Sequence, residues 1–156
     1  MSRESSIERH GPGEVTITRI FDAPRRRLWA AWTEPEPFAR WFSTPPFTTP
    51  VSGVAMDVRV GGEWRATQVS SADGARLPFA GVYKEVTEPE RLVLTFENLE
   101  DRSDPDFEFL TLTFNDLGDK TELVLRQTGH LPDDEYAFLA EGYSRFFDQL
   151  DVYLSE

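Results

Sequence analysis

Two spacings of hydrophobic residues divide the chain into a strand-rich part and one long helix. Between residues 14 and 128, apolar and polar residues alternate in short runs, as in strands with one buried face. These runs predict strands over 14–21, 54–60, 63–71, 76–88, 91–99, 107–115 and 120–128. Over residues 133–154 the apolar positions recur at three- and four-residue steps, which predicts one helix about 33 Å long.

Two short helices are expected after the first strand. Pro24 lies where a helix begins, because proline is tolerated only in the first turn. Thr33 and Glu36 have the spacing of a capping box, which predicts the start of a second helix. Residues 43–52 contain three prolines and are expected to form a stiff loop without a regular strand.

The order of these elements predicts an α+β fold with its helices and strands segregated. Every link between consecutive strands is short, so neighbouring strands are expected to be antiparallel. Turn signals at Gly61-Gly62, Asp73-Gly74 and Gly118 agree with this interpretation. No repeat or linker is apparent, so we expect a single domain over 14–156, preceded by a loose tail over 1–13.

Composition and charge narrow the classes of function. Twelve Phe, four Trp and four Tyr can fill a core, and the lack of Cys excludes disulfides and thiolate sites. No apolar run approaches the roughly 20 residues that a membrane helix needs. Residues 97–156 hold 16 acidic and four basic side chains, and thus the whole net charge of −12. This acidity disfavours nucleic acid and anionic membranes, and indicates either a basic partner or a solvated surface.

Several segments, in their order and spacing, resemble a known family. They are Phe21-Asp22-Ala23-Pro24, Leu28-Trp29, Ala31-Trp32-Thr33, Trp41-Phe42, residues 57–64, residues 81–86, Pro89-Glu90-Arg91-Leu92 and Thr128-Gly129. Together they are similar to the START-like (SRPBCC) helix-grip superfamily, in the branch named after activators of the heat-shock protein 90 ATPase. The resemblance covers residues 14–154. It implies a curved antiparallel sheet of six to seven strands wrapped around the C-terminal helix, with a cavity between them. Where such proteins often have Trp after the late-helix Gly, this chain has Tyr143.

Strand alternation predicts which side chains face that helix. One face of three strands carries Leu92, Leu94 and Phe96; Leu110, Leu112 and Phe114; and Leu123, Leu125 and Gln127. Gln127 would therefore point inward among apolar neighbours. It either orients a ligand's polar group or lies near the open end of its strand and meets water.

Two further positions each allow two interpretations. Arg19 shares a face with Ile17 and Phe21, so it either binds a ligand carboxylate or forms a salt bridge with Glu14, Asp57 or Glu85. Gly142 interrupts the long helix at a cost of about 1 kcal/mol relative to Ala. We expect close packing against the sheet there, the alternative being room for a ligand.

The aromatic residues supply the remaining candidates for a ligand site. Trp41 and Phe42, with Phe47, either form a gate beside the proline-rich loop or cap one end of the sheet. Trp64 and Tyr83 either wall a pocket or belong to the core. The predicted ligand-binding set is Trp41, Phe42, Trp64, Tyr83, Phe96, Phe114, Gln127, Tyr143, Phe147 and Arg19.

No catalytic centre, metal site or cofactor motif is apparent. His10 and His130 make a poor metal set, and Asp57 and Glu63 beside Gly61-Gly62 are expected to be solvated. The leading hypothesis is therefore the binding of a small apolar molecule, a lipid or an aromatic, by a cytoplasmic protein. Two alternatives stay open: an enzyme of the cyclase or hydrolase type, and a chaperone-associated protein that stimulates a chaperone ATPase. A homodimer is also left open.

Overall fold

The structure is a computed structural model that describes residues 6–8, 12–43, 45–97, 99–100, 103 and 107–156. Its helices are α1 (Arg25–Thr33), α2 (Pro35–Trp41) and α3 (Asp133–Leu154), with a short 3-10 turn at Val51–Gly53. Its strands are β1 (Ser6–Glu8), β2 (Glu14–Phe21), β3 (Phe47–Thr48), β4 (Val54–Met56), β5 (Glu63–Ser70), β6 (Arg76–Thr87), β7 (Arg91–Phe96), β8 (Glu108–Asp116) and β9 (Thr121–Thr128).

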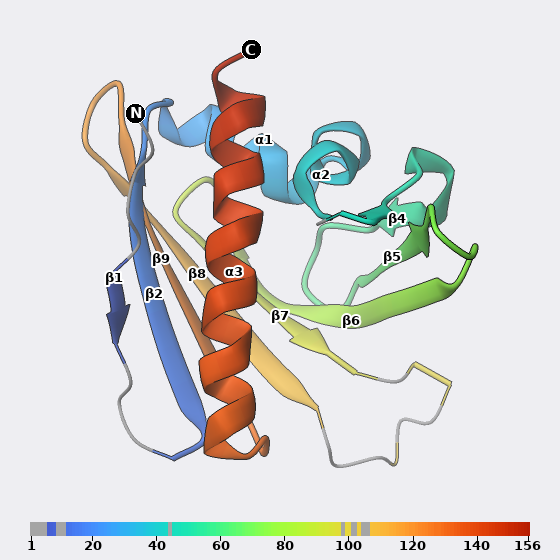
Figure 1. The fold of residues 1–156 in the computed structure, drawn as a ribbon. Coiled ribbons are helices and arrows are strands. Elements are labelled where there is room, and N and C mark those ends of the chain that lie inside the picture. Colours follow the sequence, from blue (N-terminus) through green and yellow to red (C-terminus); the bar gives the residue numbers. More distant parts are fainter. Residues whose placement is uncertain (1–5, 9–11, 44, 98, 101–102, 104–106) are drawn as a thin grey trace.

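The strands form one antiparallel sheet that curves around α3 (Figure 1). Their order is β1-β2-β9-β8-β7-β6-β5-β3, and β4 also pairs with β5. Short turns join β5 to β6, β6 to β7 and β8 to β9, whereas the longer segment 97–107 separates β7 from β8. Strand β2 pairs with β9 and so lies next to the last strand of the chain. In Figure 1, α3 runs along the concave face, and α1 and α2 lie near its C-terminal end. The expected α+β helix-grip architecture is therefore confirmed.

The core lies between α3 and the face that strand alternation predicted. Leu92, Leu112 and Leu125 occupy one row of the register across β7, β8 and β9, and all three are fully buried. On the opposite side of the core, the ring of Phe147 meets that of Phe21 edge to face, with centroids 5.4 Å apart. The buried residues of α3 are Tyr136, Ala140, Tyr143, Phe147, Leu150 and Leu154, which recur at helical spacing on one face.

Several local predictions are wrong. Residues 6–8 are not a loose tail, because they pair with β2; the other residues predicted in that tail are outside the described part, apart from 12 and 13. Residues 47–48 form a two-residue strand within the proline-rich loop. The strand predicted over 54–60 ends at Met56, because the chain turns back through Gly61, whose φ is +85°. Strands of two or three residues are too short for an alternation of apolar and polar positions to predict them.

The expected capping box is also absent. The Thr33 hydroxyl instead donates to the Trp29 carbonyl, 2.8 Å away, within the last turn of α1. Glu34 is the residue that caps α2, without a side-chain hydrogen bond, and Pro35 follows at the first helical position. Thr33 is the last residue of α1, so it is not in position to cap α2.

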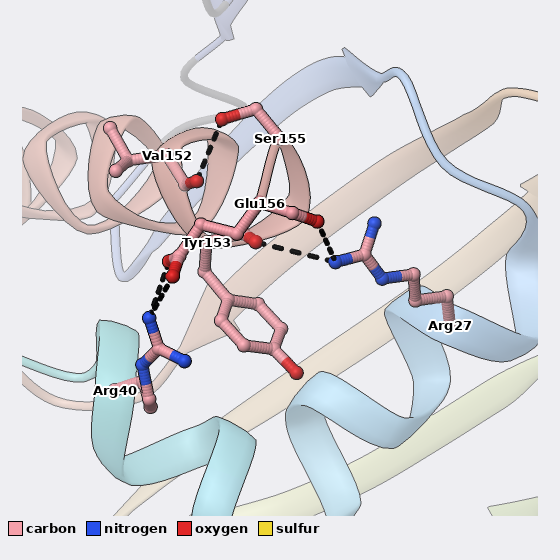
Figure 2. Close-up of polar contacts among 6 residues, drawn as sticks. All are labelled: Arg27, Arg40, Val152, Tyr153, Ser155 and Glu156. Carbon is pink, nitrogen blue, oxygen red and sulfur yellow. Dashed lines mark hydrogen bonds and ion pairs between the residues drawn. The ribbon is translucent and has the colours of Figure 1, made fainter.

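Two arginines hold the C-terminal end of α3 (Figure 2). Arg27 of α1 donates to the carbonyls of Leu154 (2.5 Å) and Tyr153 (3.3 Å), and Arg40 of α2 pairs with the Glu156 carboxylate. Both guanidinium groups also lie over the Tyr153 ring, 5.6 and 5.2 Å from its centroid. Cations at a helix C-terminus satisfy its last carbonyls and its dipole. The short helices therefore fix where α3 ends.

Candidate functional site

A cavity of about 190 Å³ lies between α3 and the curved sheet, and we call it the α3 cavity. Its lining comes from α3 and the segment just before it, from the C-terminal end of α2, and from β6, β7 and β9. The lining residues are Phe42, Phe79, Phe96, Gln127, Leu131, Leu139, Gly142, Tyr143 and Phe146. Seven of the nine are apolar or glycine, so the composition of the cavity wall resembles that of a hydrophobic core.

The absence of a side chain at Gly142 helps to keep this cavity open. A Cβ atom built on Gly142 would meet nothing within 4 Å, although the residue lies inside a helix and lines the cavity. The expectation of close packing against the sheet is therefore wrong. The alternative, room beside the helix, is what the structure shows.

We expect Gly142→Ala to stabilise the protein. Alanine forms helix more readily than glycine by about 1 kcal/mol, and its methyl group has free space here. The unfolding midpoint should rise by about 2–4 °C. Thermal unfolding followed by circular dichroism measures this, and a lower midpoint would show that the position is packed after all.

Aromatic rings give one side of the cavity its shape. Phe42 stacks on Phe146 at 5.2 Å between centroids and meets Phe79 edge to face at 5.4 Å. Phe79 also approaches Phe96 at 6.4 Å. These rings come from α2's C-terminal end, α3, β6 and β7. The cavity wall is therefore built by elements that are far apart in sequence.

Gln127 and Tyr143 are the two lining residues with polar side-chain groups, and these groups hydrogen-bond to each other. The Tyr143 hydroxyl donates to Gln127 Oε1 (2.5 Å), and Gln127 Nε2 donates to Glu108 Oε1 (3.0 Å). Glu108 also accepts from the Tyr136 hydroxyl (2.7 Å) and from the His130 backbone N–H (2.8 Å, to Oε2). We call these five residues the Glu108 network. Gln127 is buried and paired, so the expectation that it meets water is wrong.

Gly129 makes room for the Glu108 carboxylate. A Cβ at Gly129 would lie 1.5 Å from Glu108 Oε2, so no other residue fits without displacing the carboxylate. Burial, and secondarily the charge of Glu108, raises the pKa of Tyr143. Burial and the hydrogen bond to Glu108 raise the pKa of Tyr136 to about 12. Both hydroxyls therefore stay protonated at neutral pH and act as donors.

The predicted site residues fall into three groups. Phe42, Phe96, Gln127 and Tyr143 line the α3 cavity. Trp64 and Tyr83 are buried and border a separate void of only about 20 Å³, so that part of the interior is filled. Trp41, Phe114, Phe147 and Arg19 pack elsewhere in the core. Of these two spaces, the α3 cavity is the larger.

Arg19 forms a salt bridge, with partners that the sequence did not indicate. Its Nη1 lies 2.9 Å from Asp148 Oδ1 and 2.9 Å from Asp151 Oδ2, both on α3. The guanidinium is also 5.5 Å from the centre of the Phe147 ring. Arg19 thus fastens β2 to α3 and is not part of the lining of the cavity.

Sequence reasoning missed Glu108, Phe79 and Phe146. For Glu108 a signal existed, since it shares the alternation of Leu110, Leu112 and Phe114 and so had to face inward. Phe146 lies on the predicted stripe of α3, but the stripe alone does not separate cavity wall from core. For Phe79 a signal existed too, because it shares the alternation of Tyr83 along β6 and no register shift lies between them.

The described ranges hold neither a metal-binding cluster nor a membrane-spanning helix. No group of three or more His, Cys, Asp or Glu side chains is placed there to hold a metal ion. None of the helices combines the length and the apolar character that crossing a membrane requires. His10 is outside the described residues, and Asp57 pairs with its neighbour Arg59 at 2.9 Å.

A curved sheet that grips a long C-terminal helix and leaves a cavity beside it defines a domain of the START-like (SRPBCC) type. Residues 22–155 match the model of the family described as "Activator of Hsp90 ATPase homolog 1-like protein". The chain belongs to this family. A search of curated proteins finds no match.

Solved structures share the fold closely. A protein from Chromobacterium violaceum is 25% identical, with a TM-score of 0.79 over 92% of this chain and 98% of that chain. A protein from Rhodobacter sphaeroides is 21% identical, with a TM-score of 0.81 over 97% of this chain and 98% of that chain. The AHSA1-like protein from Aeromonas hydrophila is 20% identical, with a TM-score of 0.71 over 90% and 92% of the two chains.

Proposed function

We propose that this protein binds a small, mostly apolar molecule in the α3 cavity. The observation that carries the proposal is an apolar space of about 190 Å³ beside a helix whose glycine leaves it unfilled. This space is open to solvent on one side, so its apolar lining stays in contact with water when nothing is bound. A ligand that covers the lining would gain the free energy of burying that apolar area.

The size of the cavity limits the ligand. An engineered apolar cavity of about 150 Å³ accommodates benzene, so a space of about 190 Å³ suits a molecule of one or two small rings, or a short branched chain. Its rigid aromatic wall favours flat molecules. A long acyl chain would need the rings of Phe42 and Phe146 to separate.

The site favours binding over acid–base catalysis. Glu108 is the carboxylate nearest in the hydrogen-bond chain, but it does not line the cavity and already accepts three hydrogen bonds. A general base must lie within hydrogen-bond reach of the substrate proton. Gln127 stands between Glu108 and the cavity and has no basic group to offer.

A leucine at position 142 tests the proposal. We expect Gly142→Leu to place its side chain in the cavity and to weaken binding of one- and two-ring apolar molecules at least about tenfold, a loss of about 1.4 kcal/mol. Titration of ¹⁵N-labelled protein with a panel of such molecules, followed by NMR, gives the dissociation constants and maps the shifted amides. Ala137→Leu, which adds a similar side chain at an exposed position of the same helix, is the control.

Two results would contradict the proposed function. One is a panel in which no molecule shifts the amides of residues 139–146 in the wild-type protein. The other is equal binding by wild type and Gly142→Leu, which would place the ligand elsewhere. In either case the family's chaperone-related name becomes the better guide, and stimulation of a heat-shock chaperone ATPase is the measurement to make.

A further inference from the structure

Phe42 lies on the closed side of the α3 cavity. Of the nine lining residues, only Phe42, Gln127 and Tyr143 are buried. The other six are partly exposed, so the opening to solvent lies on their side of the cavity. A molecule that enters from solvent therefore meets the Phe42 ring at the inner end of its path.

A second space lies on the other side of Phe42. We call the void of about 20 Å³ that Trp64 and Tyr83 border the inner void. Phe42 and Phe96 line both this void and the α3 cavity, so their rings stand between the two spaces. By itself the inner void has room for about one water molecule, which is too little for a ligand. Joined to the α3 cavity, it would lengthen the space that a ligand can occupy.

The structure holds Phe42 firmly in this position. Its carbonyl oxygen accepts hydrogen bonds from Thr49 Oγ1 (2.5 Å) and Gln68 Nε2 (3.1 Å), which fix the backbone. Its ring stacks on the rings of Phe38 and Phe146, with centroids 4.5 and 5.2 Å away. A ligand that pushed the Phe42 ring aside would have to break these aromatic contacts.

We propose that Phe42 sets the length of the ligand. The α3 cavity takes compact molecules of one ring or two fused rings, and the Phe42 ring excludes molecules whose rings are joined end to end. This inference rests on the proposed function and adds the shape of the ligand to it. An elongated molecule either leaves its second ring in water, and so buries less apolar area, or strains the packing around Phe42.

The molecules 2-naphthol and 4-phenylphenol test this limit. Each has one hydroxyl group and two aromatic rings, which are fused in the first and joined end to end in the second. We expect wild-type protein to bind 2-naphthol at least about tenfold more tightly, because the second ring of 4-phenylphenol does not fit behind Phe42. NMR titrations give the dissociation constants. Nuclear Overhauser contacts with the indole rings of Trp32 and Trp64, which both line the inner void, should be absent for either molecule.

Phe42→Ala should join the two spaces. We expect 4-phenylphenol to bind this variant at least about tenfold more tightly than it binds wild type, and to contact the indole rings of Trp32 and Trp64. Phe42→Val keeps more of the packing and should change the affinity in the same direction, so the test does not depend on the alanine variant folding.

Phe146→Ala is the matched control. It removes the same ring from the wall of the α3 cavity, but Phe146 does not line the inner void. In this variant 4-phenylphenol should therefore make no contact with Trp32 or Trp64, whatever its affinity.

Two results would overturn the length limit and leave the proposed function standing, because 2-naphthol binds in both. One is equal affinity of the wild type for the two molecules, or contact of 4-phenylphenol with Trp32 and Trp64 in the wild type. The other is a folded Phe42 variant in which 4-phenylphenol gains no affinity. If neither molecule binds the wild type, the length limit falls and the result counts against the proposed function as well.

Discussion

Replacing Glu108 with alanine should lower the free energy of unfolding by about 4 kcal/mol. Two buried donors, from Gln127 and Tyr136, would lose their acceptor at once, and each unpaired buried group costs about 1–3 kcal/mol. The partly buried His130 N–H would lose its acceptor as well. Small domains have only about 5–15 kcal/mol of stability in total. The unfolding midpoint should therefore fall by about 10 °C. Urea denaturation and thermal scans measure the two quantities.

Glu108→Gln is the matched control for this loss. Its amide keeps an oxygen that can accept from the His130 N–H, and it keeps the volume of the side chain, so we expect a smaller loss of about 1–2 kcal/mol. A Glu108→Ala protein as stable as the wild type would mean that the three donors find other acceptors. The network would then be incidental to the fold.

The second large effect is expected at Arg19. Arg19→Ala should cost about 3 kcal/mol, because Arg19 is only 3% exposed and makes charge-assisted hydrogen bonds to Asp148 and Asp151. It also packs its cation against the rings of Phe21 and Phe147. Denaturant unfolding of the variant measures the loss.

An exposed arginine provides the comparison for Arg19. Arg126 on β9 pairs with Glu14, but its side chain is 53% exposed, and surface pairs of this kind contribute about 0–1 kcal/mol. Arg126→Ala should therefore change the unfolding free energy by less than about 1 kcal/mol. Equal losses at both positions would show that burial of Arg19 does not strengthen its interactions with α3.

Periodicity was sufficient to predict the elements that are long. The helix over 133–154 and the inward faces of β7, β8 and β9 follow directly from spacing, because each buries a continuous apolar row. The strands β1, β3 and β4 have only two or three residues, and pairing decides them, not the local sequence.

The site was harder to predict than the fold. Whether an inward aromatic such as Phe42 or Phe147 lines a cavity or fills the core depends on what faces it from other elements. Gly142 is the clearest case. The spacing of the apolar residues around it predicts a helix whether Gly142 packs against the sheet or borders a cavity. Only the distance to neighbouring atoms shows that it leaves space.

The outermost strands of the sheet have a consequence for self-association. Within the described residues, β1 and β3 at the two ends are three and two residues long. A strand from another molecule could form few backbone hydrogen bonds along either border, and such brief edges protect a sheet from uncontrolled edge-to-edge growth. Chains of this protein that meet in concentrated solution are therefore poor templates for one another's β-structure.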